Sequence, residues 1–577
     1  MTRRLALLLA AVLVLGGCVQ VPTSGPVREG VQRGIGDEPP LQQVSAARPP
    51  PGAEPVEVVE GFFAAMLAYP ADPAAVRSYL TDAAAAGWQP ASGTTIYADR
   101  PALSGRRGGV VRVEAELAGN LTGRGAWSPP QRRRSVLDLD LTREHGQWRI
   151  ANPPRGLHVT ASYFARYYNP YSLYFFDPSA RILVPDPVYL PEGEQTATML
   201  MDGLSRGPTD WLAGAVRSFV PQGESPLPVR VSDAGVAEVT LGEAAATLGD
   251  EEVQLLAAQV AWTLAQVPEI SAFRPSVDGV PLGVGGAGDT VGTDFGAAYD
   301  PADSAASSRL FAVRGQRLYE VRQDEAAAVP GPFGTGAVPV ESFAVDRTGQ
   351  SAAVVTGGGH DIRVGTLTGG QARGDVPMLA LRGGRKLLRP QWDFTGLLWA
   401  ADRLRGGLLV QVVREDESAP VDLSASTPTD VRAFALARDG VRVAVLDGVG
   451  QDARLLIGRV VRPAEGYAEL RVDRWRVVQT PQLRLGGYRD VAWASPTELA
   501  VVARDGGGVP QLFTVSIDGS SALPTTLLEE PAVSVAASST EALPTIVGTE
   551  GGTLWIQRGD RWEQLLDRRL TQPSYVE

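Results

Sequence analysis

Few residues of this 577-residue chain have the types and spacing that catalysis or metal binding requires. None of the three histidines, His145, His158 and His360, has a partner at metal-ligand spacing. We interpret His145 and His360 as solvated residues of turns. Asp138 and Asp140 alternate with leucines, so both carboxylates would lie on one face of a strand, either solvated or as an acid–base pair. The sequence shows no nucleophile-elbow, Walker, EF-hand or zincin motif, and it predicts no catalytic, cofactor-binding or metal-binding residues.

The one cysteine, Cys18, offers a different chemistry, which is acylation of its thiol. Arg3 and Arg4 precede an apolar run that is shorter than the ~20 residues needed to span a bilayer. The run ends at Leu15-Gly16-Gly17-Cys18, which resembles a bacterial lipobox. That resemblance implies that residues 1–17 are a signal peptide, and that Cys18 becomes an S-diacylglycerol and N-acyl cysteine. The alternatives are an unlipidated signal peptide or a cysteine placed by chance.

The composition bounds the remaining possibilities. The net charge of −12 and the export signal argue against a protein that binds nucleic acid. The length predicts about three domains. Nearly all basic residues are arginine, with Lys386 as the one lysine, which indicates a GC-rich genome such as that of an actinobacterium.

The first half of the chain predicts a tether and a small α+β domain. Residues 18–54 are rich in proline and glycine, and as a flexible coil they would reach roughly 30–35 Å. Residues 55–156 begin with a helix whose apolar face includes Phe62, and a second helix is predicted from Asp72-Pro73 to Gly87. Alternating strand patterns follow. Two helices on an antiparallel sheet suggest a cystatin- or NTF2-like arrangement.

Residues 157–282 predict an aromatic connector and a second α+β domain. The connector, residues 157–170, is interpreted as interdomain packing, with a partner surface as the alternative. The clearest helix runs from Glu251 to Gln266 and ends before Pro268. The order of short motifs resembles the GerMN domain of spore-germination proteins: Leu173-Tyr174-Phe175, Gly207-Pro208-Thr209, Val239-Thr240-Leu241, Gln259 to Leu264 and Val277-Asp278-Gly279. Residues 283–306 are predicted to be an unpatterned linker.

Residues 307–577 contain a repeat of short strands and Gly/Asp turns, which predicts an all-β propeller. Its starts recur every ~40–60 residues at Phe343, Trp392, Phe434, Trp493 and Val535. A predicted hairpin from Leu310 to Val321 has no blade start before it in the sequence. The strand at Leu570 to Tyr575 resembles the approach to a start. We therefore expect this last strand to pair with the hairpin and close a ring of about six blades.

The sequence leaves three classes of function open. A propeller enzyme, such as a lactonase or a quinone-dependent dehydrogenase, would gather ligands near the blade starts. The blade starts supply Phe, Trp and Val with a few aspartates nearby, namely Asp346, Asp393 and Asp439, which is little to support catalysis. Binding of a cell-wall glycan or peptide is the second class. The third, which we favour, is a non-enzymatic interaction protein. The run Arg132-Arg133-Arg134 is a surface loop in the simplest interpretation, or else a contact for anionic lipid or an acidic partner.

Taken together, the lipobox at Cys18, the GerMN-like segment and the C-terminal repeats resemble the LpqB family of actinobacterial lipoproteins. The resemblance covers essentially the whole chain. It implies an accessory protein anchored by lipid on the extracytoplasmic face of the cell membrane. Its implied partner is the extracytoplasmic domain of a sensor histidine kinase in an MtrAB-like two-component system, which governs envelope and cell-division homeostasis. The family resemblance implies no catalytic or cofactor residues.

Overall fold

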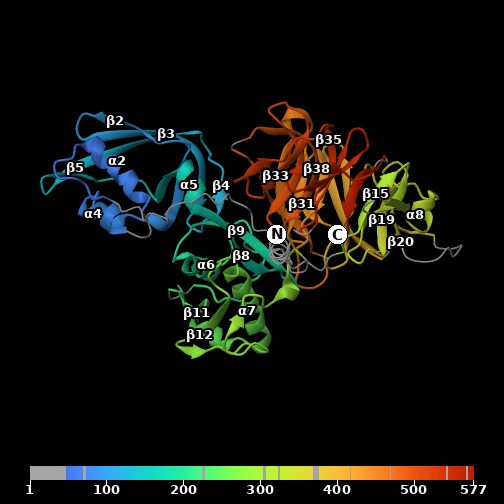
Figure 1. Cartoon of the computed structure of the whole chain (residues 1–577), viewed down its shortest axis with the longest axis horizontal. Helices are drawn as coiled ribbons and strands as arrows, with labels where there is room; N and C mark the ends of the chain where they lie inside the picture. The colour runs from blue at the N-terminus through green and yellow to red at the C-terminus, as the bar shows by residue number, and fades with distance from the viewer. Residues whose placement is uncertain are drawn as a thin grey trace, which may run out of the picture. The chain divides into compact units, whose positions relative to one another are not determined.

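The structure is a computed structural model of the chain. It describes residues 47–68, 73–223, 228–302, 307–322, 325–367, 376–415, 417–467, 469–481, 483–540, 543–566 and 569–576. Cys18, the predicted signal peptide and most of the predicted tether lie outside these residues. The described residues form an N-terminal α+β domain, a second α+β domain and an all-β region (Figure 1).

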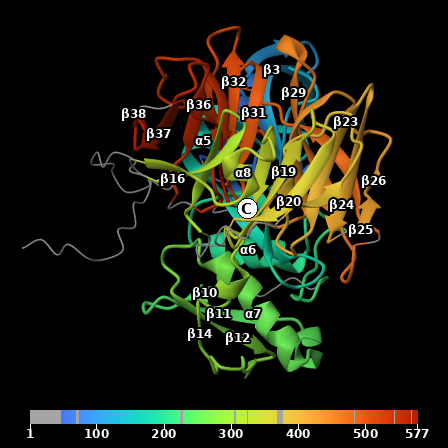
Figure 2. The same cartoon turned by 90° about the vertical axis from the view of Figure 1, so that its right-hand side faces the viewer.

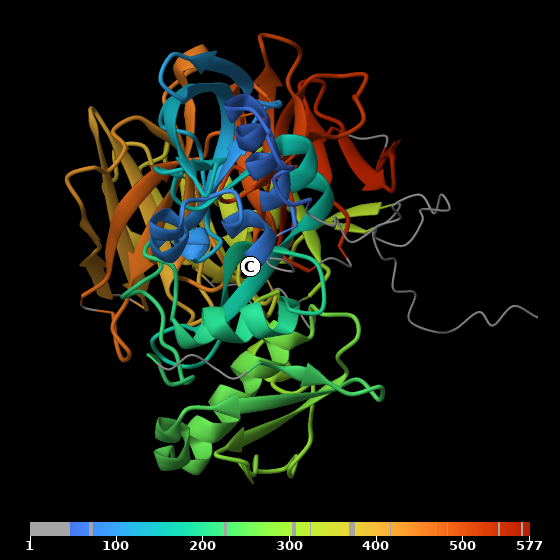
Figure 3. The same cartoon turned by 90° about the vertical axis from the view of Figure 1, so that its left-hand side faces the viewer.

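The N-terminal domain packs helices on one face of an antiparallel-rich sheet (Figure 3). Helix α2 (Pro55–Met66) starts with a proline, and the Glu57 carboxylate accepts a hydrogen bond from the Glu54 N–H. Its buried Val59, Phe62 and Met66 pack on the sheet core, as predicted. The strand order is β6-β5-β3-β1-β7, and β2 and β4 also pair with β3. The strands are β1 (Gly93–Tyr97), β2 (Ala102–Arg106), β3 (Val110–Thr122), β4 (Trp127–Ser128), β5 (Arg134–Glu144), β6 (Gln147–Ile150) and β7 (Leu157–Thr160).

Two predictions for this domain are wrong. The single helix expected from Asp72-Pro73 to Gly87 is two helices, α3 (Pro73–Arg77) and α4 (Asp82–Gly87). Between them Leu80 forms a β-bridge with Ile150, and the Thr81 hydroxyl accepts the Ala84 N–H as the cap of a new helix. The end of the predicted tether also belongs to the domain, because Ala53 is buried and the Tyr79 hydroxyl donates to the Ala47 carbonyl over 2.8 Å.

The connector forms helix α5 (Ala161–Tyr167), which leads into the second domain. Phe164 packs between Trp127, Tyr168 and Tyr189, with ring centroids 5.2–5.6 Å from its own. The Tyr163 hydroxyl donates to the Leu67 carbonyl over 2.5 Å. These contacts agree with the prediction that the aromatic residues of the connector serve packing between domains.

The second α+β domain is built around helix α7 (Asp250–Leu264), which lies among buried residues on nearly every side. Strands β11 (Val236–Leu241) and β12 (Ala272–Val277) are parallel, and α7 connects them. Strands β8 (Tyr168–Phe176) and β9 (Leu183–Pro191) form a separate antiparallel pair. The remaining elements are α6 (Thr196–Ser205), β10 (Arg230–Val231), β13 (Val280–Pro281) and the 3-10 helix η2 (Glu243–Thr247).

The segment that follows this domain differs from the predicted linker. Strand β14 (Val291–Gly292) pairs with β12, and Val284 and Val291 are buried in the domain core. Tyr299, at the end of the 3-10 helix η3 (Ala297–Tyr299), packs edge-on against Phe176 at a centroid distance of 5.0 Å. The apolar residues stand at irregular intervals among glycines, so they show neither helical nor strand periodicity.

The described residues from 307 to 576 form six sheets. Strands of several of them are seen in Figure 2. Sheet 1 holds β15 (Leu310–Arg314), β16 (Arg317–Arg322), β17 (Glu325–Ala328) and β39 (Thr571–Tyr575); sheet 2 holds β18 (Ser342–Val345), β19 (Ser351–Thr356), β20 (Asp361–Thr366) and β21 (Met378–Leu381); sheet 3 holds β22 (Gln391–Trp392), β23 (Leu398–Leu404), β24 (Gly407–Arg414) and β25 (Glu417–Pro420). Sheet 4 holds β26 (Asp422–Leu423), β27 (Val431–Leu436), β28 (Arg442–Asp447), β29 (Arg454–Val461) and β30 (Arg471–Val477); sheet 5 holds β31 (Leu485–Ser495), β32 (Glu498–Asp505), β33 (Gln511–Ser516) and β34 (Ala522–Pro524); sheet 6 holds β35 (Ala532–Ala536), β36 (Ile546–Thr549), β37 (Leu554–Arg558) and β38 (Arg561–Gln564). A short helix, α8 (Pro332–Thr335), and the 3-10 helix η4 (Gly450–Asp452) lie in the connections.

The hydrophobic core of this region lies between neighbouring sheets. Separate apolar clusters join sheets 1 and 2, 2 and 3, 3 and 4, 4 and 5, 5 and 6, and finally 6 and 1. The expected closure is confirmed, because β39 pairs with β15 in the antiparallel register Leu310↔Tyr575 and Phe311↔Ser574. A closed ring leaves no first or last sheet with an unpartnered face.

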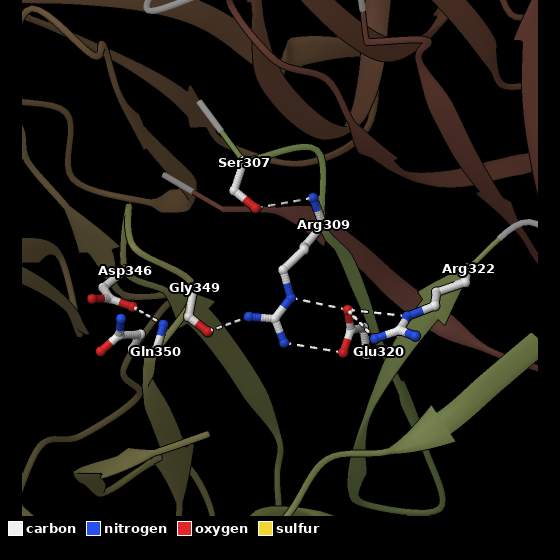
Figure 4. A network of polar contacts seen from close by, with 7 residues as sticks. All are labelled: Ser307, Arg309, Glu320, Arg322, Asp346, Gly349 and Gln350. Atoms are coloured by element: carbon white, nitrogen blue, oxygen red, sulfur yellow. Dashed lines mark hydrogen bonds and ion pairs between the residues drawn. The ribbon is translucent and has the colours of Figure 1, made fainter. Parts of the chain in front are cut away.

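An arginine network joins the closing sheet to the next one (Figure 4). Arg309 forms a two-point ion pair with Glu320, with N–O distances of 2.9 and 3.0 Å. It also donates to the carbonyl of Gly349 in the turn before β19. Arg322 contacts the same Glu320 at 3.4 Å. The network lowers the pKa of the Glu320 carboxyl, chiefly through the hydrogen bond from Arg309.

Candidate functional site

The structure places the three histidines on separate elements. His145 is exposed in the turn between β5 and β6, where it and Gly146 both have positive φ values, as a two-residue hairpin requires. His360 is exposed, and its Nδ1 lies 2.5 Å from the Gly384 carbonyl oxygen. His158 is buried on β7, where its Nδ1 lies 2.7 Å from the Tyr97 hydroxyl. Burial lowers the pKa of His158 to about 4, so its ring is neutral at pH 7.

The predicted carboxylate pair lies on the exposed face of the N-terminal sheet. Arg112 donates to both oxygens of Asp138 over 2.8 Å, and this hydrogen bonding lowers the pKa of that carboxyl. Asp140 instead accepts a hydrogen bond from the Asn152 amide over 3.0 Å. The two carboxylates therefore have separate partners, which supports the interpretation of a solvated face.

The three aspartates near the blade starts stabilise their own turns. Asp393 is buried, and its oxygens accept hydrogen bonds from the Thr395 and Leu397 N–H groups, from the Trp399 indole and from Arg462. Asp346 accepts the backbone N–H groups of residues 350 and 351 in the equivalent turn. Asp439 accepts the N–H of residue 441 and pairs with Arg442. Each of these carboxylates is engaged in hydrogen bonds of its own turn, and the three do not lie together as a set of metal or cofactor ligands.

A cavity of about 420 Å³ lies among the first strands of the propeller sheets and the segments beside them. Its lining includes five arginines, Arg347, Arg389, Arg432, Arg438 and Arg489. Aromatic side chains line it as well, namely Trp392, Phe394, Phe434, Trp493 and Tyr575. Asp490 is the one carboxylate among the lining residues. This candidate site is therefore cationic and aromatic.

This cavity is not among the sites that the sequence predicts. Each arginine lies within four residues of a blade start, as with Arg347 after Phe343 and Arg438 after Phe434. Because blade starts surround the axis of a propeller, arginines beside several of them converge. The recurrence of an arginine beside several blade starts is the sequence pattern that could have predicted a cationic cavity.

Side chains of sheet 4 also contact the second domain. The buried Arg442 donates to the Pro185 carbonyl over 3.4 Å, and Arg459 donates to the Trp211 carbonyl over 3.2 Å. In return, the Trp211 indole donates to the Arg474 carbonyl over 2.8 Å. An apolar cluster that includes Leu212 and Val441 accompanies these bonds.

Comparisons with known proteins agree with this architecture. Residues 48–165 match the family described as the N-terminal domain of lipoprotein LpqB. Residues 172–283 match the family described as sporulation and spore germination, and residues 316–575 match the lipoprotein LpqB beta-propeller domain. A relative from Streptomyces coelicolor named lipoprotein LpqB is 30% identical over 99% of this chain and 97% of its own. The chain belongs to the LpqB family. Relatives with that name from Thermobifida fusca and Mycobacterium bovis (strain BCG) are 28% and 29% identical, over 98% and 93% of this chain and 97% and 92% of theirs.

Similarities to solved structures are weaker. The first GerMN domain of the sporulation protein GerM from Bacillus subtilis is 22% identical, with a TM-score of 0.19, over 22% of this chain and 97% of that one. A chain of a nidogen/laminin complex is 10% identical, with a TM-score of 0.36, over 47% of this chain and 98% of its own. Similarities of this size carry no argument about function.

The five arginines of the cavity all lie within the LpqB beta-propeller match. In the part of the chain that the structure describes, no helix has the length and hydropathy of a membrane span.

Proposed function

We propose that this LpqB-family chain is a lipoprotein, anchored through Cys18 on the extracytoplasmic face of the cell membrane, that modulates a two-component sensor kinase. The observation that carries the proposal is the match to named LpqB lipoproteins over 99% of the chain. The lipobox-like sequence before Cys18 supports the anchor. The kinase is the partner that the family resemblance implies, and the residues themselves support a binding protein near the membrane.

The chemistry of the described residues supports binding over turnover. The predicted carboxylates are engaged in ion pairs and turns, and His158 is buried against Tyr97. Among the described residues, no group of three or more His, Cys, Asp or Glu side chains has a geometry that holds a metal ion. We therefore place the function in protein contacts. A lipid anchor would assist, because confinement to one membrane raises the effective concentration of both partners.

The exposed face of the N-terminal sheet is the surface that we propose for the kinase contact. On β3 and β5, the residues that point away from α2 include Arg112, Glu114 and Asp138, together with Val136, which is 54% exposed. In such an interface Val136 would supply an apolar contact and the charged side chains around it a polar rim. Helix α7, by contrast, is nearly buried, so it offers little surface for docking.

Site-specific photocrosslinking in intact cells tests the proposal. A photoreactive amino acid at Val136 or at Glu114 reports on the exposed face, and one at Val449, which is 61% exposed in the propeller, is the matched control. We expect crosslinks to a histidine kinase from the first two positions and not from the third. Crosslinks only to wall polymers, or to no kinase from any position, would refute the proposal.

Two finer points of fold belong to the same proposal. We infer that the six sheets are six blades, since each pair of neighbouring sheets, sheets 6 and 1 included, shares an apolar core. We also assign the N-terminal domain to the cystatin- or NTF2-like arrangement, because α2 lies across one face of a curved antiparallel-rich sheet.

A further inference from the structure

We propose that the propeller cavity is a binding site for an organic anion that carries a carboxylate or phosphate group beside a ring or apolar portion. This inference goes beyond the proposed contact with a kinase and does not depend on it. It rests on the charge of the cavity lining, on two buried donors, and on the aromatic side chains that share the lining.

The charge of the lining is strongly unbalanced. Five arginines face one carboxylate, Asp490, whose nearest oxygen lies 3.8 Å from Arg389. Asp490 is already engaged, because it accepts hydrogen bonds from the N–H groups of Val491 and Val535 over 3.0 Å. The formal charge of the lining residues themselves is therefore positive, which favours the binding of anions.

Arg432 and Arg489 have counter-ions that lie outside the lining. Arg432 pairs with Asp430 over 2.8 Å, and Arg489 pairs with Glu550 over 2.6 Å. Both acids are about half exposed, at 45% and 52%, so these pairs are weakened by water and exchange readily. A guanidinium has five N–H donors, so one carboxylate leaves donors for a second anion.

The lining also holds two buried polar groups that lack hydrogen bonds. The Trp392 indole nitrogen and the Ser534 hydroxyl have no partner among the described residues, and Ser534 is 9% exposed. Buried polar groups are nearly always satisfied in native proteins, so such groups call for a partner. Both can donate a hydrogen bond, which is the role that an anion requires.

The aromatic residues of the lining indicate what the uncharged part of the ligand would be. Trp392, Trp493 and Tyr575 contribute aromatic atoms to the lining, which favours a ligand with a sugar ring or an apolar group beside its charge. The volume of about 420 Å³ lies within the range of ~300–1,000 Å³ typical of small-molecule sites. Arginines beside aromatic rings therefore fit a small phosphorylated or carboxylated molecule, or the acidic end of a larger polymer.

Calorimetric titration of the whole chain in detergent tests this site. The probes are glucose 6-phosphate, muramyl dipeptide as a carboxylate that carries a sugar ring, inorganic phosphate, and neutral N-acetylglucosamine. We expect saturable binding of at least one anionic probe and none of the neutral sugar. Binding of glucose 6-phosphate alone assigns the ligand to phosphates, and binding of muramyl dipeptide alone assigns it to carboxylates.

Two sets of variants locate the binding. The double variant R432Q/R489Q should weaken the anion at least tenfold, and the milder S534A should weaken it several-fold while the fold is kept. The matched control R322Q/R558Q changes two exposed arginines outside the cavity, at 77% and 55% exposure, and should leave binding unchanged. Failure of every anionic probe to bind at 10 mM, or equal loss in the cavity and control variants, would overturn the proposal.

Discussion

Removal of residues 570–577 should destabilise the propeller strongly, because β39 closes the ring. The deletion takes away Leu570, Tyr575 and Val576, which are 1%, 6% and 5% exposed. Burial of each such side chain contributes about 1.5–3 kcal/mol, so the loss in the free energy of unfolding is about 4.5–9 kcal/mol. It also removes the hydrogen bond from the Tyr575 hydroxyl to the Pro544 carbonyl and leaves β15 as a free edge.

Differential scanning calorimetry of residues 47–577 measures this effect. For a domain of this size, 1 kcal/mol corresponds to about 2–4 °C in Tm, so the propeller transition should fall by about 9–36 °C. A matched pair isolates burial from chain length. Leu570→Ala should cost about 2–5 kcal/mol, whereas Leu527→Ala, at a side chain that is 68% exposed, should change stability by less than about 0.5 kcal/mol. A truncated chain whose propeller transition stays within about 2 °C of wild type would refute the closure.

Three further predictions concern the turns, the buried histidine and the anchor. Asp393→Ala should lower the free energy of unfolding, measured by denaturant titration, by about 3–5 kcal/mol, because it leaves the buried Arg462 without a counter-ion. Asp346→Ala changes an exposed turn, so the same titration should show a loss of about 1–2 kcal/mol. The pKa of His158 is lowered by burial to about 4, so its contribution to stability is complete above pH 6.5 and is lost as pH falls from there toward 4, by roughly 3 kcal/mol. The pKa of the buried Asp186 is raised to about 6, so its contribution to stability changes with pH in the opposite direction. The measurement that isolates His158 is therefore the difference in free energy of unfolding between wild type and His158→Gln as a function of pH. A difference that does not vary with pH would contradict the assignment. Cys18→Ala should abolish metabolic labelling with a palmitate analogue, and labelling at the wild-type level would exclude Cys18 as the lipid acceptor.

Much of the fold follows from local patterns in the sequence. The blade starts at Phe343, Trp392 and Phe434 repeat because each sheet buries the same positions against its neighbours. Helix α7 was predictable because acidic residues precede an apolar face and Pro268 follows it. These signals are local, so they need no knowledge of the tertiary structure.

The errors arise where tertiary contacts override local pattern. The break at Leu80 depends on a bridge to Ile150, which lies in a strand far along the chain. Residues 284–299 lack periodicity, yet Val291 and Tyr299 complete the core of the second domain. The cavity escaped prediction for a related reason, since its arginines come from separate blades and meet only when the ring closes.

The central claim, that this chain modulates a sensor kinase from the membrane surface, is tested most directly by the phosphorylation of the cognate response regulator. Four strains suffice: wild type, a deletion, and the deletion complemented with either the wild-type chain or Cys18→Ala. We predict that the deletion changes the phosphorylated fraction, that the wild-type chain restores it and that Cys18→Ala does not. A phosphorylated fraction that is the same in the deletion as in wild type would contradict the claim.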